Sequence, residues 1–211
     1  MVDALMGGQP LSATDLALEG EVTAQTASSH LSQLVSAGLL HRRRQGRHRF
    51  YELASAEVAD ALESLVELGR SKGHPMNEER AAFRAARTCY DHLAGTLGVL
   101  IVRSLRTSRC LRARGASFQV THKGHAFFER LGIDVESSQN ERRVFARRCL
   151  DRTERVPHLG GALGAAFAEH CFQQGWVVRN PGNRTLSVTA VGRRAFERHL
   201  GVEWAGRTAR S

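Results

Sequence analysis

Residues 23–53 read TAQTASSHLSQLVSAGLLHRRRQGRHRFYEL, and this stretch decides the fold of the first part of the chain. Thr23 is a residue type that caps helices, because its hydroxyl can accept a hydrogen bond from an unpaired amide of the first turn. Apolar residues then recur at the spacing of one buried helical face: Ala27, Leu31, Leu34 and Val35. Gly38 follows as a typical helix stop. The pattern predicts a helix over Thr23–Ser36.

The opposite face of this helix is polar, uncharged and made of short side chains: Gln25, Ser28, Ser29 and Ser32. Such a face can enter the major groove of DNA and form hydrogen bonds with base edges and phosphates. An ordinary surface helix with solvated serines has the same pattern, so the helix alone does not establish DNA binding.

The segment after the helix predicts a basic hairpin. Gly46 supplies the turn between residues 41–44 and 47–53, and Tyr51 and Leu53 share one face of the second strand, which can anchor inward. Five arginines lie near the tip: Arg42, Arg43, Arg44, Arg47 and Arg49. Arginine runs are often solvated surface, but here the run directly follows a helix that suits a groove. We expect these side chains to contact phosphates or a minor groove.

Upstream, Ser12–Asp15 has the pattern of a capping box, which predicts a first helix that ends at a turn through Gly20 and Glu21. The pieces DLA, VTAQTASSHLSQL, AGLL, RRRQGR and FYEL, in this order, resemble the winged helix-turn-helix of ArsR/SmtB-type bacterial repressors over about the first 70 residues. The resemblance implies a dimer that binds an operator and is released by an effector. Glu21 stands where such proteins often have glycine, which indicates a turn shifted by one residue.

The expected DNA-contacting residues lie on the second helix and on the wing: Thr23, Gln25, Thr26, Ser28, Ser29, Ser32, Arg43, Arg44, Arg47, His48 and Arg49. The metal sites of the resembled family do not carry over. The helix ATDLALEG lacks a thiol, and SAEVADALESLVEL lacks histidine. The apolar stripe of the latter favours core or dimer packing: Val58, Leu62, Leu65 and Val66.

Composition agrees with a polyanionic partner. The chain has 211 residues and a formal net charge of +9, which favours nucleic acid. No apolar run approaches the roughly 20 residues of a membrane span, and no secretory signal is visible. We therefore expect a cytoplasmic protein without a membrane partner, in which the four cysteines are thiols.

The expected fold class is mainly α with small β-hairpins (α+β), in two domains. Residues 1–70 form the winged helix-turn-helix, and residues 71–77 (SKGHPMN) form a linker. Residues 78–211 form a C-terminal domain for effector sensing or dimerisation.

The C-terminal domain contains an internal repeat. HLAGTLG at 92–98 returns as HLGGALG at 158–164, and VTHKGHAFFERLGID at 120–134 returns as VTAVGRRAFERHLGVE at 188–203. We expect two pseudo-symmetric helix–hairpin–helix units, about 86–134 and 146–203. Small residues recur in both first helices, which predicts that these two helices pack on each other: Ala94, Gly95, Gly98, Gly160, Gly161 and Gly164.

Matching positions in the two repeats carry side chains with site chemistry: Cys89, Asp91, His92, Cys149, Asp151 and His158. Thiolates and imidazoles suit zinc or a softer metal, and two halves could supply four ligands at one interface, although the spacings fit no standard zinc motif. A thiol switch near arginines such as Arg87, Arg147 and Arg148, and a small-molecule pocket near the seam, remain open. So does a structural role, with cysteines in apolar gaps and Asp and His as caps.

An enzyme is the competing class. GxGxxG, GxxxxGK[ST], GxSxG and HExxH are absent, although a thiol- or metal-dependent enzyme or sensor could use a Cys/His pair across the repeats. We expect no enzymatic activity and no required cofactor, only a metal ion or small molecule as effector. The sequence predicts a dimeric repressor that binds an inverted-repeat operator.

Overall fold

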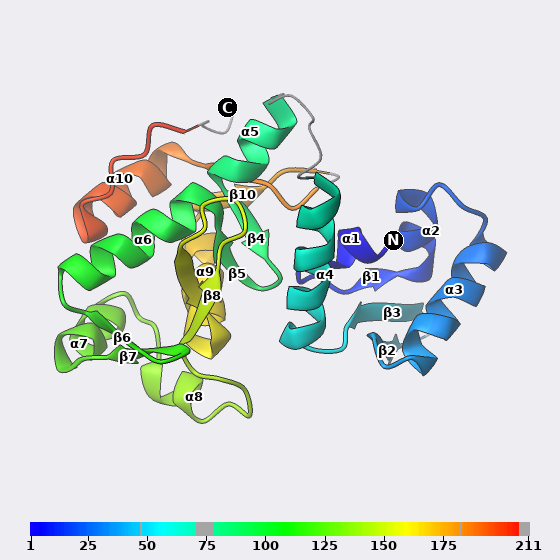
Figure 1. The fold of residues 1–211 in the computed structure, drawn as a ribbon, viewed down its shortest axis with the longest axis horizontal. Coiled ribbons are helices and arrows are strands. Elements are labelled where there is room, and N and C mark those ends of the chain that lie inside the picture. The colour runs from blue at the N-terminus through cyan, green and yellow to red at the C-terminus, as the bar shows by residue number, and fades with distance from the viewer. Residues whose placement is uncertain (47, 71–77, 182, 207–211) are drawn as a thin grey trace. The chain divides into compact units, whose positions relative to one another are not determined.

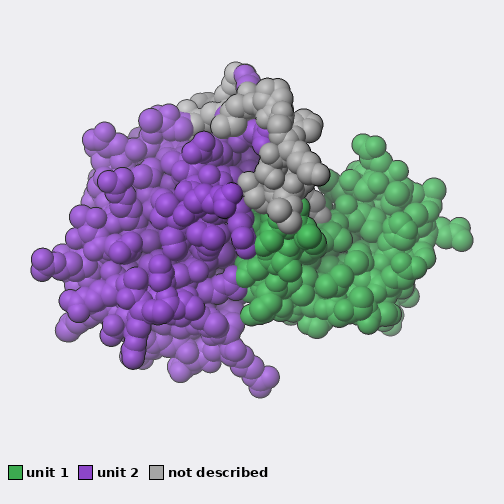
Figure 2. Space-filling model, viewed as in Figure 1, with its two compact units in different colours: residues 1–75, 181–184 green, residues 76–180, 185–211 purple. Residues whose placement is uncertain are grey.

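The computed structural model describes residues 1–46, 48–70, 78–181 and 183–206. The chain forms two compact units, coloured separately in Figure 2. Unit 1 comprises Met1–Pro75 with Pro181–Arg184, and unit 2 comprises Met76–Asn180 with Thr185–Ser211. The predicted linker, residues 71–77, lies outside the described residues.

Unit 1 has the element order of a winged helix-turn-helix (Figure 1). Its elements are α1 (Val2–Leu5), β1 (Leu11–Ser12), α2 (Ala13–Glu19), α3 (Ala24–Ser36), β2 (Leu40–Gln45), β3 (His48–Leu53) and α4 (Ala56–Arg70). The strands form one antiparallel sheet in the order β1-β3-β2. The mixture of helices and short antiparallel strands, with this N-terminal domain, is confirmed.

The predicted helix starts in unit 1 are present. Ser12 accepts a hydrogen bond from the Asp15 amide, and the Asp15 carboxylate accepts one from the Ser12 amide, which completes the capping box of α2. Thr23 caps α3 by accepting from the Thr26 amide. Gly38 has a φ of 70° directly after the α3 C-cap, which satisfies the helix end without a side-chain clash.

The core of unit 1 lies between α2, α3 and the inner face of the sheet. Its residues are almost fully buried: Leu16, Ala27, Leu31, Leu40, Tyr51 and Leu53. Leu34 and Val35 are only partly buried. The alternation on β3 therefore places Tyr51 and Leu53 inward, as predicted. Arg49 follows the same alternation but lies nearer the hairpin tip and is exposed.

Unit 2 begins with α5 (Glu78–Ala85) and then runs twice through a hairpin, a long helix, a second hairpin and a further helix. The first passage is β4 (Arg87–Cys89), β5 (His92–Ala94), α6 (Gly95–Thr107), β6 (Leu111–Arg114), β7 (Ser117–Val120) and α7 (His122–Arg130). After α8 (Val135–Gln139), the second is β8 (Arg147–Leu150), β9 (Pro157–Gly160), α9 (Gly161–Gln173), β10 (Val177–Arg179), β11 (Leu186–Val188) and α10 (Ala190–Leu200).

The strands of unit 2 interlock the two passages. The second hairpin of the first passage joins the first hairpin of the second passage in one antiparallel sheet, β6-β7-β8-β9. Conversely, an antiparallel bridge between Arg87 and Thr185 connects β4, in the first hairpin of the first passage, with the residue before β11, in the second hairpin of the second passage. Each passage therefore pairs with the other through backbone hydrogen bonds, and both share one apolar core.

The helices α6 and α9 do not pack mainly on each other, so that prediction is wrong. The main partner of α6 across the two passages is β9, and that of α9 is β5. Gly98 and Gly164 let each helix lie close to the strand before it, since a Cβ on Gly98 would lie 2.6 Å from the Leu93 carbonyl oxygen and one on Gly164 would lie 2.4 Å from that of Leu159. Across the passages, the same added Cβ atoms would lie 3.4 Å from Cβ of His158 and 3.3 Å from Cβ of His92. The small residues thus seat helices on strands rather than helices on each other.

No helix within the described residues combines the length and apolar character needed to cross a bilayer.

Candidate functional site

The predicted reading face of α3 is exposed. Gln25, Ser28, Ser29 and Ser32 are all solvent-exposed, while Thr26 is partly buried. Two of the hydroxyls also serve the helix itself, since Thr23 caps its first turn and the Ser32 hydroxyl donates to the Ser28 carbonyl oxygen over 2.9 Å. DNA contact by these residues stays a prediction, and Gln25 and Ser28 are the side chains best placed to test it.

The wing presents exposed cations on a two-stranded ribbon. Arg43 and Arg44 pair in register with Phe50 and Arg49. Arg43 lies 3.4 Å from the Glu52 carboxylate, and Nε of Arg44 donates to the Gly46 carbonyl oxygen over 3.1 Å. Arg47 lies outside the described residues, as does the side chain of His48, and their predicted DNA contacts remain untested.

The turn between α2 and α3 differs from the prediction. Gly20 has a right-handed φ of −89°, while Glu21 itself adopts a left-handed φ of 50°. The turn is therefore not shifted, and Glu21 occupies the conformation that glycine adopts without cost.

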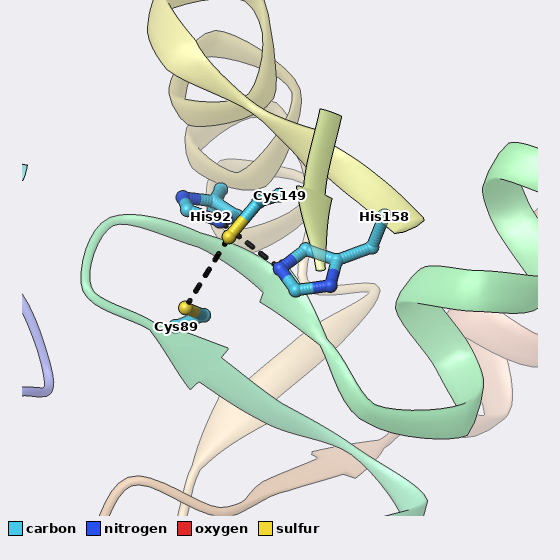
Figure 3. Close-up of side chains that lie close together, drawn as sticks. All are labelled: Cys89, His92, Cys149 and His158. Carbon is cyan, nitrogen blue, oxygen red and sulfur yellow. Dashed lines mark hydrogen bonds between the residues drawn. The ribbon is translucent and has the colours of Figure 1, made fainter. Parts of the chain in front are cut away.

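A second candidate site lies in unit 2, where four predicted residues converge. Cys89 and His92 face each other across the β4–β5 hairpin, and Cys149 and His158 do so across β8–β9. Their ligand atoms all lie within 4.8 Å of one another (Figure 3). All four side chains are buried. We call these four residues the Cys/His cluster.

The two predicted aspartates lie directly behind the histidines of the Cys/His cluster. Oδ1 of Asp91 is 3.1 Å from Nδ1 of His92. Oδ2 of Asp151 is 3.4 Å from Nδ1 of His158, a contact whose geometry does not meet that of a hydrogen bond. Both imidazoles therefore direct Nε2 toward the centre of the cluster, and these two nitrogens are 3.1 Å apart.

Two arginines hold the aspartates, a role that the sequence did not predict for them. Arg143 pairs with Asp91 and donates to the Gly161 carbonyl oxygen over 2.8 Å. Arg87 is buried and donates to both carboxylate oxygens of Asp151, each over 3.2 Å. Arg87 lies two residues before Cys89 in the repeat, so its position could have marked it as part of the site. That it pairs with Asp151, 64 residues away, could not be read from the sequence.

Asp151 also fulfils the structural role considered for the aspartates. Its carboxylate accepts the amide of Gly95, the first residue of α6, over 2.6 Å, and the amide of Thr153 over 2.9 Å. Burial by itself would raise the pKa of Asp151, but the Arg87 guanidinium, His158 and hydrogen bonds from the Thr153 side chain and the Gly95 amide lower it to about 2.

The electrostatics of the Cys/His cluster favour a thiolate. Cys89 and the two nearby imidazoles hold the pKa of Cys149 far below its ordinary range, although burial opposes them. Burial would likewise lower the pKa of His92, but Asp91 and Cys149 raise it to about 9. For His158, burial dominates and lowers the pKa. A thiolate is the form of cysteine that binds metals and reacts with oxidants.

The other two cysteines have structural surroundings. Cys110 and Cys171 are buried in the apolar core of unit 2, and burial raises the pKa of the Cys171 thiol. The gap-filling interpretation therefore fits Cys110 and Cys171, while Cys89 and Cys149 belong to a polar constellation.

Unit 2 also contains an open cleft of about 480 Å³. Its lining combines apolar side chains with Arg103, Arg106 and Arg148. The three guanidinium groups would suit an anionic small molecule.

Comparison with known proteins gives matches for the N-terminal winged helix-turn-helix and for almost the whole chain. Residues 2–49 match the model of the MarR family. Over 203 residues, 95% of this chain and 90% of the relative, the chain is 40% identical to YdfF of Bacillus subtilis (strain 168), described as an uncharacterized HTH-type transcriptional regulator. The matching model is that of the MarR family, so the ArsR/SmtB subtype is not confirmed.

Proposed function

Since the chain belongs to the helix-turn-helix transcriptional regulators, with a MarR-family winged helix-turn-helix at its N-terminus, we propose that it is a cytoplasmic, dimeric repressor that binds an inverted-repeat operator. The observation that carries the proposal is the exposed polar face of α3 beside the exposed cationic wing. In this arrangement α3 enters the major groove, and the wing contacts the backbone or the minor groove.

Dimerisation is proposed to use α4. Leu65 on this helix is 64% exposed, and Val58 and Leu62 are only partly buried. An apolar stripe left in water on a helix favours association with a second copy of the chain. A two-fold dimer places two α3 helices in successive major grooves about one helical turn apart, which explains why an inverted repeat is expected.

Effector sensing is proposed to reside in unit 2, a duplicated module that is separate from the winged helix-turn-helix of unit 1. Support comes from the equivalent order of elements in its two passages and from the Cys/His cluster between them. An effector bound there would alter the affinity for DNA, and DNA would alter the affinity for the effector by the same factor. A transcriptional regulator needs no catalytic step, so the Cys/His pairs serve binding rather than chemistry in this proposal.

The test is selection of DNA by the purified full-length protein from a pool of random duplexes. The proposal predicts enrichment of an inverted repeat with half-site centres about 10–10.5 base pairs apart, and two chains per duplex in sedimentation. Arg44→Ala should weaken cognate and unrelated duplexes alike and reduce the slope of log affinity against log salt by about one. Lack of enrichment would refute sequence-specific binding, and an unchanged salt slope would remove Arg44 from the phosphate contacts.

A further inference from the structure

The Cys/His cluster has the donor set and the spacing of a tetrahedral metal site. The two sulfur atoms are 3.9 Å apart, and the two Nε2 atoms are 3.1 Å apart. Zinc bonds of about 2.3 Å to sulfur and about 2.0–2.1 Å to nitrogen give tetrahedral edges of about 3.8 Å and about 3.3–3.4 Å. The sulfur separation also far exceeds a disulfide bond of about 2.05 Å. The sulfur–sulfur and nitrogen–nitrogen separations thus match a tetrahedral zinc site, and no separation among the four ligand atoms exceeds 4.8 Å.

The orientation of the histidines suits a cation between them. Each imidazole faces an aspartate with Nδ1, and a carboxylate only accepts hydrogen bonds. A neutral imidazole with its proton on Nδ1 presents a lone pair at Nε2. Two such lone pairs 3.1 Å apart repel each other unless a metal ion lies between them or one nitrogen carries a proton. Carboxylates behind ligating histidines are the usual outer support of a metal site, since they fix the tautomer and the ring.

Charge is balanced when a divalent cation is present. Two cysteine thiolates neutralise the two positive charges of the ion. Behind the two histidines, Asp91 is paired with Arg143, and Asp151 is paired with Arg87. A buried site of this kind tolerates its charges because each has a partner.

We propose that the Cys/His cluster binds one zinc ion, which joins the two passages of unit 2. Each passage supplies one thiolate and one imidazole from register partners of a single hairpin. Four protein ligands leave no open position for substrate or water, so the site is structural or regulatory rather than catalytic. Two thiolates exclude magnesium and calcium, which prefer oxygen ligands.

The backbone around the ligands adopts conformations that the local residue types would not favour by themselves, which supports a built site. Tyr90, between Cys89 and His92, has a left-handed φ of 59°, a conformation that tyrosine adopts only under constraint. A Cβ on Gly160 would lie 3.1 Å from Nε2 of His92 and 3.2 Å from the Cys149 Cβ. The absence of a side chain at Gly160 therefore leaves room for the His92 ring at the centre of the cluster.

The experiment measures metal in the full-length protein, without reference to DNA. The reduced protein, purified without added chelator, is analysed by native mass spectrometry and elemental analysis, and apo-protein is titrated with Co²⁺. We expect one zinc per chain, and with cobalt a tetrahedral visible spectrum with thiolate-to-metal charge-transfer bands. Cys149→Ala and His158→Ala should each lose stoichiometric zinc, while Cys110→Ala, a matched change of a buried cysteine outside the cluster, should retain it.

The cobalt spectrum of the wild-type protein decides the outcome even if a variant fails to fold. Absence of thiolate-to-cobalt bands, or retention of one zinc by folded Cys149→Ala, overturns the proposal. One equivalent of copper without zinc overturns the assignment to zinc. A Cys89–Cys149 disulfide in protein purified under reducing conditions, detected as a mass lower by two hydrogen atoms, overturns it as well. Because DNA plays no part in these measurements, failure here leaves the proposed function standing.

Discussion

Nε2 of His92 lies 3.1 Å from Nε2 of His158, although 66 residues separate the two histidines in the chain. The contact brings the two passages of unit 2 together at one buried point, where a thiol from each passage also lies.

Metal removal should destabilise unit 2. A ligand that binds only the folded state adds about 2.7 kcal/mol when its free concentration is 100 times its dissociation constant. Differential scanning calorimetry of the protein with and without a zinc chelator should therefore show a lower Tm after chelation. Cys110→Ala should shift with chelator as the wild type does, whereas Cys149→Ala should not respond. Identical melting curves for wild-type protein with and without chelator would contradict the expectation.

Asp91→Asn should weaken metal binding without unfolding the protein. The carboxylate orients His92 over 3.1 Å, and loss of such outer support reduces metal affinity about 10–100-fold. Competition with a chromophoric chelator gives the affinity. The matched control is Asp134→Asn, which changes an exposed carboxylate that caps α8 in the same unit. Equal affinities in both variants would show that Asp91 does not position the imidazole.

Arg87→Met should destabilise unit 2 strongly. Arg87 and Asp151 are 1% and 0% exposed, and removal of one partner of a buried ion pair costs about 3–5 kcal/mol because the other charge remains uncompensated. Urea unfolding measures the loss. The double variant Arg87→Met/Asp151→Asn should recover part of it. A single variant that unfolds at the wild-type urea concentration would show that the pair contributes little.

Several features of this fold follow from local sequence. The start of α3 at Thr23 and the capping box of Ser12 and Asp15 rest on contacts three residues apart, so the residue types suffice to predict them. The inward side chains of β3 follow from alternation along one strand. The equivalence of Cys89 with Cys149 was visible because the repeat preserves the order of residues.

Other features depend on partners far apart in the chain. The sequence did not reveal that Arg87 pairs with Asp151, because a side-chain contact between residues 64 positions apart leaves no local pattern. The hairpin that carries Cys89 and His92 was missed although its contacts are local. The small residues of α6 and α9 predicted close packing but not the partner, which is a strand in each case. The left-handed Glu21 was missed because glutamate rarely adopts that conformation.

Glu21→Gly should stabilise unit 1. A residue with a side chain pays about 1–2 kcal/mol in the left-handed region, and the added flexibility of glycine in the unfolded chain offsets about half of it. We expect a gain of about 0.5–1 kcal/mol in urea unfolding. Glu19→Gly, two residues earlier at the end of α2, should instead lower stability, because glycine is unfavourable inside a helix. A destabilised Glu21→Gly would show that the turn is not strained.

The most direct test of the account is a comparison of selected and scrambled duplexes in fluorescence anisotropy with Gln25→Ala and Ser28→Ala, two exposed side chains on α3. If α3 is the reading helix, each variant binds the selected operator about 1–3 kcal/mol more weakly than the wild type, while its affinity for the scrambled duplex is unchanged. If both variants bind both duplexes as the wild type does, α3 is not the helix that reads DNA.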